Sequence, residues 1–284
     1  MTDEPVRDIR LADNHWSEFA ELWTGLMSYR YLNKTTPALD VGFDPDENET
    51  MPLRHDMRNA HGGIMAAPLC IACPEPAWND DEVVPAPVVA STQILDDARG
   101  VAKVEVLREV VNFGRTMGFM RSKIVDADDH DRVIAVSAGM GVSLGAAPDG
   151  YEMVENPPIE VVDSPDMPPL HEVFGCTQDA DGHWRLPALR PAQASPHAAL
   201  HLGPIHIVFD IAAHEAATQQ SGSANIQVIN WYVMFVKPGL VGPFRCETQV
   251  QTGTSGRINV DLTLYDEGRD DRLMTTGSAV FELR

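Results

Sequence analysis

The amino-acid sequence predicts an α+β protein made of two similar halves, each with a long helix followed by four antiparallel strands. Two observations predict this class. A helical segment followed by four segments rich in Val, Ile and Thr occurs twice along the chain. No helical segment separates the four strands of either set, and strands that follow one another directly pair antiparallel. The 284 residues are enough for two such domains.

The first half is expected to begin with two helices. Apolar side chains recur at intervals of three and four over residues 14–32, which indicates an amphipathic helix. A second helix of small residues is expected over residues 60–72, where Pro68 should kink it or remove one hydrogen bond. Four strands are expected after it, at residues 88–95, 101–113, 116–126 and 133–144.

An acidic, Pro-rich segment joins the halves. Residues 148–169 hold six prolines and six acidic residues but no Lys or Arg, so we expect this segment to run over the surface. The second half has a helix opened by His201 and strands expected at residues 225–236, 244–251, 257–265 and 273–283. The expected organisation is therefore an N-terminal helix plus first repeat over residues 1–147, a linker over 148–170, and a second repeat over 171–284.

The two halves align at a nearly constant offset. His61 and His201 are 140 positions apart. The Gly-Arg dipeptides that begin at positions 114 and 256 are 142 apart, and the Asp-Arg dipeptides that begin at 131 and 271 are 140 apart. This agreement indicates an internal duplication, so that one chain would form a pseudo-dimer.

The charge and the cysteine content of the chain limit which partners we expect it to bind and where in the cell we expect it. The chain has 42 acidic and 21 basic residues, giving a formal net charge of −21. This charge argues against nucleic acid and anionic membranes as partners, and an anionic ligand would need a local basic patch. No stretch approaches the ~18 apolar residues of a membrane span, and we see no secretory signal. Four cysteines are too few for a disulfide framework, so we expect a cytoplasmic protein.

The helix opened by His61-Gly62-Gly63, followed by four antiparallel strands, resembles the hotdog fold. With the Gly114-Arg115 turn, it is similar to acyl-CoA thioesterases of the phenylacetate-degradation type. The resemblance implies two hotdog domains in tandem, each a central helix wrapped by an antiparallel sheet. It implies hydrolysis of an acyl-CoA thioester to free acid and coenzyme A, with no cofactor and no metal. Double-hotdog units of this kind could further form a homo-oligomer.

The resemblance also implies a division of the active site between the repeats. In that family an Asp or Glu nine residues after the His performs catalysis. Nine residues after His61 is Cys70, whereas nine residues after His201 is Asp210. In the second repeat, however, Leu202-Gly203-Pro204 replaces the Gly-Gly, and proline has no N–H.

The chemistry of thioester hydrolysis needs both parts. Backbone N–H groups at a helix N-terminus stabilise the negative charge on the carbonyl oxygen, and a carboxylate attacks or activates water. We expect His61, Gly62 and Gly63 to provide the first part and Asp210 the second. Nine residues of one helix span roughly 13 Å, so the two parts can meet only if helices from both repeats lie antiparallel.

Other interpretations of these residues stay open. Asp210 lies four residues from both His206 and His214, so it could pair with either, and the three could bind a metal. Cys70 and Cys73 are expected to be small buried residues. Residues that could bind the substrate, including its phosphates, are Asn59, Arg115, Asn230, Lys237 and Arg257.

Two other functions remain possible on the same fold. They are an enoyl-CoA hydratase or dehydratase, and a non-catalytic acyl-CoA-binding protein. A larger class of double-hotdog acyl-CoA thioesterases uses an Asp with a Thr and a Gln. Where we align its Thr, this chain has Val228, which favours the His-Gly-Gly type.

Overall fold

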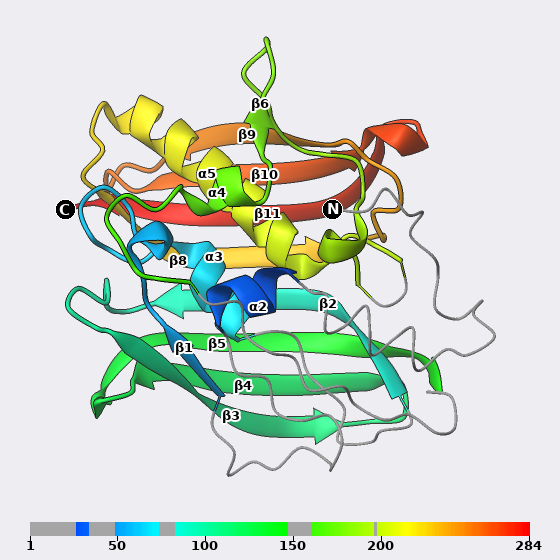
Figure 1. Ribbon diagram of the computed structural model, residues 1–284, viewed down its shortest axis with the longest axis horizontal. Coiled ribbons are helices and arrows are strands. Elements are labelled where there is room, and N and C mark those ends of the chain that lie inside the picture. Colours follow the sequence, from blue (N-terminus) through cyan, green and yellow to red (C-terminus); the bar gives the residue numbers. More distant parts are fainter. Residues whose placement is uncertain (1–26, 34–48, 74–82, 147–160, 196–197) are drawn as a thin grey trace.

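The halves of the chain share one continuous sheet. The structure is a computed structural model, and it describes residues 27–33, 49–73, 83–146, 161–195 and 198–284. Its 11 strands are all antiparallel and lie in the order β1-β3-β4-β5-β2-β8-β11-β10-β9-β7-β6 (Figure 1). Strands β1–β5 come from the first half and β6–β11 from the second. The halves meet in the middle of the sheet, where β2 pairs with β8.

The α+β class and both sets of four strands are confirmed. The strands of the first half are β1 (Glu49–Pro52), β2 (Val83–Ile94), β3 (Lys103–Phe113), β4 (Met117–Asp126) and β5 (Asp129–Ala146). Those of the second half are β6 (Thr177–Gln178), β7 (Trp184–Leu186), β8 (Ile226–Phe235), β9 (Phe244–Thr252), β10 (Ile258–Asp266) and β11 (Arg272–Leu283). The short strands β1, β6 and β7 were not predicted, and they extend the two edges of the sheet.

The helices lie together on one face of the sheet (Figure 1). They are α2 (Met27–Leu32), α3 (Ala66–Ala72), α4 (Leu170–Val173) and α5 (Leu202–Ser221). Helix α2 contacts both α3 and α5. Of the predicted helix over residues 14–32, only α2 falls within the described residues. None of the helices in the described part of the chain is long and apolar enough to cross a membrane.

Helix α3 is much shorter than predicted. It begins after Met65, whose backbone is extended, and not at residue 60. Residues 61–63 form a turn before it, in which Gly62 has a φ of +80° that glycine adopts without strain. Pro68 therefore lies in the first turn of α3, where no N–H has an intrahelical partner. For this reason it neither kinks the helix nor removes a hydrogen bond.

The duplication is real, but the predicted pairing of His61 with His201 is wrong. An isolated bridge joins Arg58 to Ile64 before α3, and another joins Ala194 to Leu200 before α5. These positions are 136 apart, as are the helix N-caps Met65 and His201. His201 therefore corresponds to Met65.

The strands keep the predicted offset of 140. Val125 pairs with Val133 across β4 and β5, and Tyr265 pairs with Leu273 across β10 and β11. The segment between helix start and sheet thus differs in length by four residues between the halves. A spacing signal for the correct pairing was present in the sequence, because His61 precedes Pro68 by seven positions and His197 precedes Pro204 by seven.

The segment predicted as a surface linker touches the first half. Asp163 accepts hydrogen bonds from the His55 backbone N–H and from His55 Nδ1, both at 2.9 Å. Asp163 is also half-exposed, as expected for a segment that crosses the surface. Residues 147–160 of the predicted linker lie outside the described part of the chain.

Candidate active site

Asp210 of the second half lies against the start of α3 from the first half. Its side chain is completely buried. Asp210 Oδ2 accepts a hydrogen bond of 2.7 Å from the Ala67 N–H, and Ala67 is the second residue of α3. The carboxylate on one central helix thus caps the N-terminus of the other. This is the kind of approach between helix and carboxylate that the sequence analysis expected, but at Ala67 and not at Gly62-Gly63.

A histidine one turn along α5 holds the other oxygen of Asp210. His214 Nδ1 lies 2.8 Å from Asp210 Oδ1, and the ring packs edge-on against Phe281 with 4.9 Å between centroids. Burial opposes the charged form of His214, but the negative charge and hydrogen bonds of Asp210 outweigh it. The pKa of His214 is therefore raised above its ordinary value. The Asp210 carboxylate therefore has His214 at one oxygen and the N-terminus of α3 at the other.

The first turn of α3 has one backbone N–H left for a ligand. Met65 N–H donates to Met57 O, and Ala67 N–H donates to Asp210. Pro68 has no N–H. The N–H of Ala66 has no acceptor among the residues that the structure describes. The Ala66 amide thus lies next to the amide that Asp210 bonds, and both Ala66 and Asp210 are completely buried.

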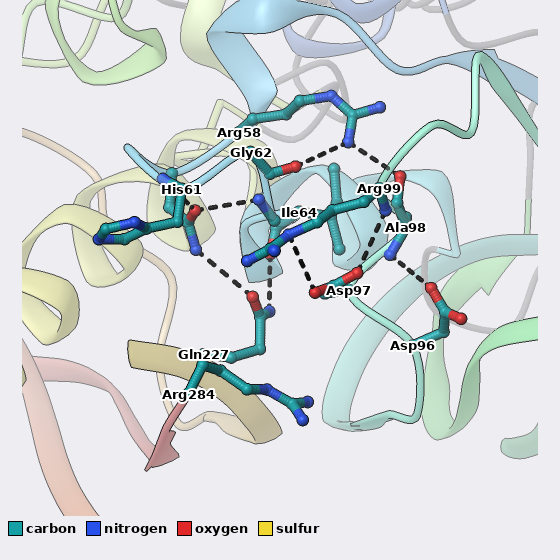
Figure 2. A network of polar contacts seen from close by, with 12 residues as sticks. Arg58, His61, Gly62, Ile64, Asp96, Asp97, Ala98, Arg99, Gln227 and Arg284 are labelled. Carbon is teal, nitrogen blue, oxygen red and sulfur yellow. Dashed lines mark hydrogen bonds and ion pairs between the residues drawn. The ribbon is translucent and has the colours of Figure 1, made fainter. Parts of the chain in front are cut away.

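The N–H groups of His61, Gly62 and Gly63 all donate hydrogen bonds to Asn59, either to its side chain or to its backbone carbonyl. The N–H groups of His61 and Gly63 both donate to Asn59 Oδ1 at 3.0 Å. The N–H of Gly62 donates to Asn59 O at 2.9 Å. His61 is exposed, and its ring points away from the rest of the network in Figure 2. The predicted role of these amides as donors to a thioester oxygen would require Asn59 to release them.

A buried glutamine on β8 fixes this turn from the other half. Gln227 Nε2 donates to Ile64 O at 3.0 Å, and its Oε1 accepts from Asn59 Nδ2 at 3.4 Å (Figure 2). A Cβ at Gly63 would overlap Gln227 Oε1, so the close approach of this side chain requires glycine there. No motif in the sequence marks Gln227, because its role depends on the pairing of the two halves.

The equivalent position at the start of α5 is closed. The His201 side chain accepts from Gly203 N–H and lies 3.3 Å from Ser28 Oγ of α2. A Cβ at Gly203 would overlap the Ser28 side chain. Pro204, like Pro68, has no N–H. Among the described residues the N–H of Leu202, like that of Ala66, has no acceptor, but no carboxylate bonds the start of α5 as Asp210 bonds the start of α3.

The other candidates on the helices do not join Asp210 as ligands or nucleophiles. His206 Nδ1 accepts from Trp231 Nε1 at 3.2 Å, and burial lowers the pKa of His206 to about 3. It is therefore a neutral core residue, and among the described residues His206, Asp210 and His214 do not bring three ligand atoms together as a metal site would. Cys70 is buried with its Sγ 3.7 Å from Thr92 Oγ1, and burial raises the pKa of this thiol. A thiol that stays protonated is a poor nucleophile.

The predicted basic residues do not form one patch. Arg115 and Arg257 are exposed in the β3–β4 and β9–β10 hairpins, which lie in opposite halves of the sheet. Lys237 is exposed after β8, and Asn230 pairs with Gln93 and Val280 within the sheet. Of the five predicted binding residues, only Asn59 lies in the loop that leads to α3.

Comparison with known proteins identifies the fold. No protein-family model and no curated protein sequence matches the chain. Three solved structures are similar to it over most of its length. Acyl-CoA thioesterase II TesB2 from Mycobacterium marinum has a TM-score of 0.57 and 11% identity, covering 90% of this chain and 98% of that one. A hot dog fold protein of unknown function from Alicyclobacillus acidocaldarius has a TM-score of 0.54 and 12% identity, covering 87% and 96%. A 12:0-ACP thioesterase from Umbellularia californica has a TM-score of 0.54 and 9% identity, covering 84% and 94%.

These likenesses define the class of protein by its fold. The chain is an α+β double hotdog like TesB2, with two central helices against one antiparallel sheet of 11 strands. The narrower resemblance to the phenylacetate-degradation type finds no support among them. The preference for that type depended on Val228 and on a His-Gly-Gly helix start, and the structure places the string in the turn before the helix.

Proposed function

We propose that the protein hydrolyses an acyl-CoA thioester to the free acid and coenzyme A. One observation carries the proposal: the buried Asp210 carboxylate bonds the N-terminus of α3 next to the Ala66 amide, which has no acceptor among the described residues. The fold supports it, since the similar structures include an acyl-CoA thioesterase and a 12:0-ACP thioesterase. Neither likeness exceeds 25% identity, so the reaction is inferred from the site.

The proposed chemistry divides between the two halves. The thioester oxygen accepts from the Ala66 N–H, where the α3 dipole stabilises the charge that develops on it. In one route Asp210 takes a proton from water as the hydroxide adds to the carbonyl carbon; the C–S bond then breaks, and the proton passes from Asp210 to the thiolate of coenzyme A. In the other route Asp210 attacks the carbonyl carbon itself, the C–S bond breaks, and the thiolate takes a proton from water; hydrolysis of the resulting mixed anhydride releases the acid and restores Asp210. His214 orients Asp210 through their contact of 2.8 Å, so we describe it as a positioning residue.

The test is thiol release from a panel of acyl-CoA esters by the wild type and by Asp210→Asn. Asparagine keeps the shape but removes the base, so turnover should fall by at least ~10²-fold. Loss of the conjugated thioester of crotonyl-CoA without thiol release would instead indicate a hydratase. Tight binding of acyl-CoA without turnover would indicate a non-catalytic binder.

Asp266→Asn is the matched control for this test. Asp266 is also completely buried and accepts hydrogen bonds from the N–H groups of Leu240, Val241 and Gly242 at 2.8–3.2 Å. It thus stabilises a turn without lying at the helix end. We expect Asp266→Asn to lower stability and leave turnover of the folded protein intact. If both variants are less stable but turn over the substrate as fast as the wild type, Asp210 is only a helix cap.

A further inference from the structure

A cavity of about 660 Å³ opens beside the loop that leads to α3. Its lining includes Arg54, His55, Arg58, Gly62 and Arg99. Three arginines thus meet at one cavity in a chain whose formal net charge is −21. An anion that approaches this acidic protein needs such a local basic site.

Arg58 brings a positive charge that no carboxylate neutralises at close range. Its guanidinium donates to the carbonyl oxygens of Gly62 and Ala98 at 3.0 and 2.9 Å (Figure 2). It also donates to the carbonyl oxygen of Val101 at 2.6 Å. These acceptors are uncharged. No carboxylate of the described residues lies within 4 Å of the Arg58 guanidinium nitrogens. The charge is fixed in place by the loop and remains available to a ligand.

Arg54 brings a buried donor that lacks an acceptor. The side chain is 3% exposed, and its Nε and Nη2 donate to Asp56 at 3.2 and 3.1 Å. Its Nη1 is buried and makes no hydrogen bond. Buried N–H groups without a partner are rare, and this one belongs to a residue that lines the cavity.

The carboxylates near the cavity are already engaged. Asp163, which also lines it, accepts from the His55 N–H and faces His55 Nδ1 at 2.9 Å. Asp97 lies outside the lining and pairs with Arg99 at 3.2 Å. Arg99 is 52% exposed at the rim, where it can rotate toward a ligand. The walls therefore present more positive than negative charge.

We propose that this cavity binds the phosphate end of a pantetheine thioester. Guanidinium groups match phosphate oxygens in charge and geometry. Gly62 lines the cavity and is five positions from Ala67 at the helix end, so the two are at most about 18 Å apart. A pantetheine arm is an extended chain that can cover such a gap, with its sulfur toward Asp210. The inference rests on the proposed function and adds the place where the phosphates of the substrate bind.

The first test measures binding to the wild-type protein by calorimetry, without turnover. The probes are coenzyme A, 4′-phosphopantetheine, pantetheine and inorganic phosphate. Coenzyme A should bind at least about tenfold more tightly than pantetheine, and the difference should shrink as salt is added. Equal binding of coenzyme A and pantetheine would overturn the proposal. So would displacement of coenzyme A by an equal concentration of inorganic phosphate.

The 4′-phosphopantetheine probe separates two sources of the same chemistry. If it binds as tightly as coenzyme A, the cavity contacts the phosphate next to the arm, which a carrier protein also presents. If only coenzyme A binds tightly, the cavity contacts the nucleotide. Either result supports a phosphate site.

The second test uses two exposed arginines that have the same kind of ion pair. Arg99→Gln should weaken coenzyme A roughly threefold to tenfold and leave pantetheine binding unchanged. Arg121→Gln is the matched control, because Arg121 is 61% exposed, pairs with Glu109 and lies outside the cavity. Equal affinity of both variants and the wild type for coenzyme A would place the phosphate elsewhere.

The two proposals can fail separately. If coenzyme A binds as described but no acyl-CoA is hydrolysed, the proposed function fails and the phosphate site stands. If acyl-pantetheine and acyl-CoA are hydrolysed with the same kcat/KM, hydrolysis stands and the phosphate site fails.

Discussion

Two histidines flank Asp210 on α5 and respond to their surroundings in opposite ways. His206 has no carboxylate beside it, so burial alone determines its behaviour and the neutral ring is favoured. His214 is also buried, but the adjacent Asp210 reverses the effect and favours the charged ring. Sequence spacing showed that both could reach Asp210. It could not show which one does, because that depends on a tertiary contact in which Trp231 Nε1 donates a hydrogen bond to His206 Nδ1.

His206 should make the fold sensitive to acid. Its pKa is about 3 in the folded protein and about 6.5 in an unfolded chain. As pH falls below about 6.5, only the unfolded chain binds the proton, so folding stability drops by roughly 1.4 kcal/mol per pH unit. Urea unfolding at pH 7 and pH 5 should show this loss in the wild type. His206→Gln keeps an acceptor for Trp231 but does not titrate, and an unchanged pH dependence in this variant would contradict the assignment.

His214 should contribute in the opposite direction. Its pKa is raised in the folded protein, so its contribution is fully present below the unfolded value of about 6.5. That contribution is lost as pH rises through the raised folded value. His214→Gln should therefore destabilise the protein by about 3 kcal/mol near pH 6, as expected for a broken buried ion pair, and by less at pH 9. Equal destabilisation at both values would mean that His214 is neutral.

Among the elements, the turn over residues 59–64 differs most from prediction. Its run of small residues is compatible with a helix, so the sequence predicts a helix that begins at residue 60. The Asn59 side chain instead bonds the amides of His61 and Gly63, and such local bonds compete with helix formation. Strands were predicted more accurately, because their alternation of side chains is set by burial on one face of the sheet. The position of this turn is set by Gln227, which is distant in sequence.

Gly63→Ala should test the contact between this turn and β8. The new Cβ would overlap Gln227 Oε1, so we expect a loss of about 1–3 kcal/mol in the free energy of unfolding. Gln227→Ala also destabilises, because it removes the hydrogen bond to Ile64 O. The double variant should be no less stable than Gln227→Ala alone, as measured by a double-mutant cycle. Additive losses would show that the two residues do not touch.

At the scale of the whole molecule, the repeat of helix and strands and the contact of Asp210 with a helix of the first half were predictable, and the alignment of the helices was not. Matching dipeptides located the hairpins, where the offset is 140. The helix starts differ by 136 because the segment between helix and sheet has a different length in each half. Asp210 was found through this approximate pairing. The Ala67 amide that it contacts could not be predicted, since it depends on how α3 and α5 pack.

The continuous sheet should unfold as one unit. Strands β2 and β8 lie in its centre with partners on both sides, whereas both residues of β6 at the edge are exposed. In native-state hydrogen exchange, amides of β2 and β8 should exchange only through global unfolding, and those of β6 through local opening. Strands β3–β5 and β9–β11 should share one opening free energy. Two separate values would show that the halves are independent domains.

The closed start of α5 has a consequence for the history of the chain. In a symmetric dimer every substitution appears twice, so neither copy can specialise, whereas duplicated halves within one chain can diverge separately. Here the Ala67 amide of α3 is capped by Asp210 of the other half, whereas its counterpart in α5, the Gly203 amide, is capped by His201 of its own half. In a dimer of two second halves, each Asp210 would face a helix start whose second amide is already bonded. The contact between carboxylate and amide seen here therefore needs both halves.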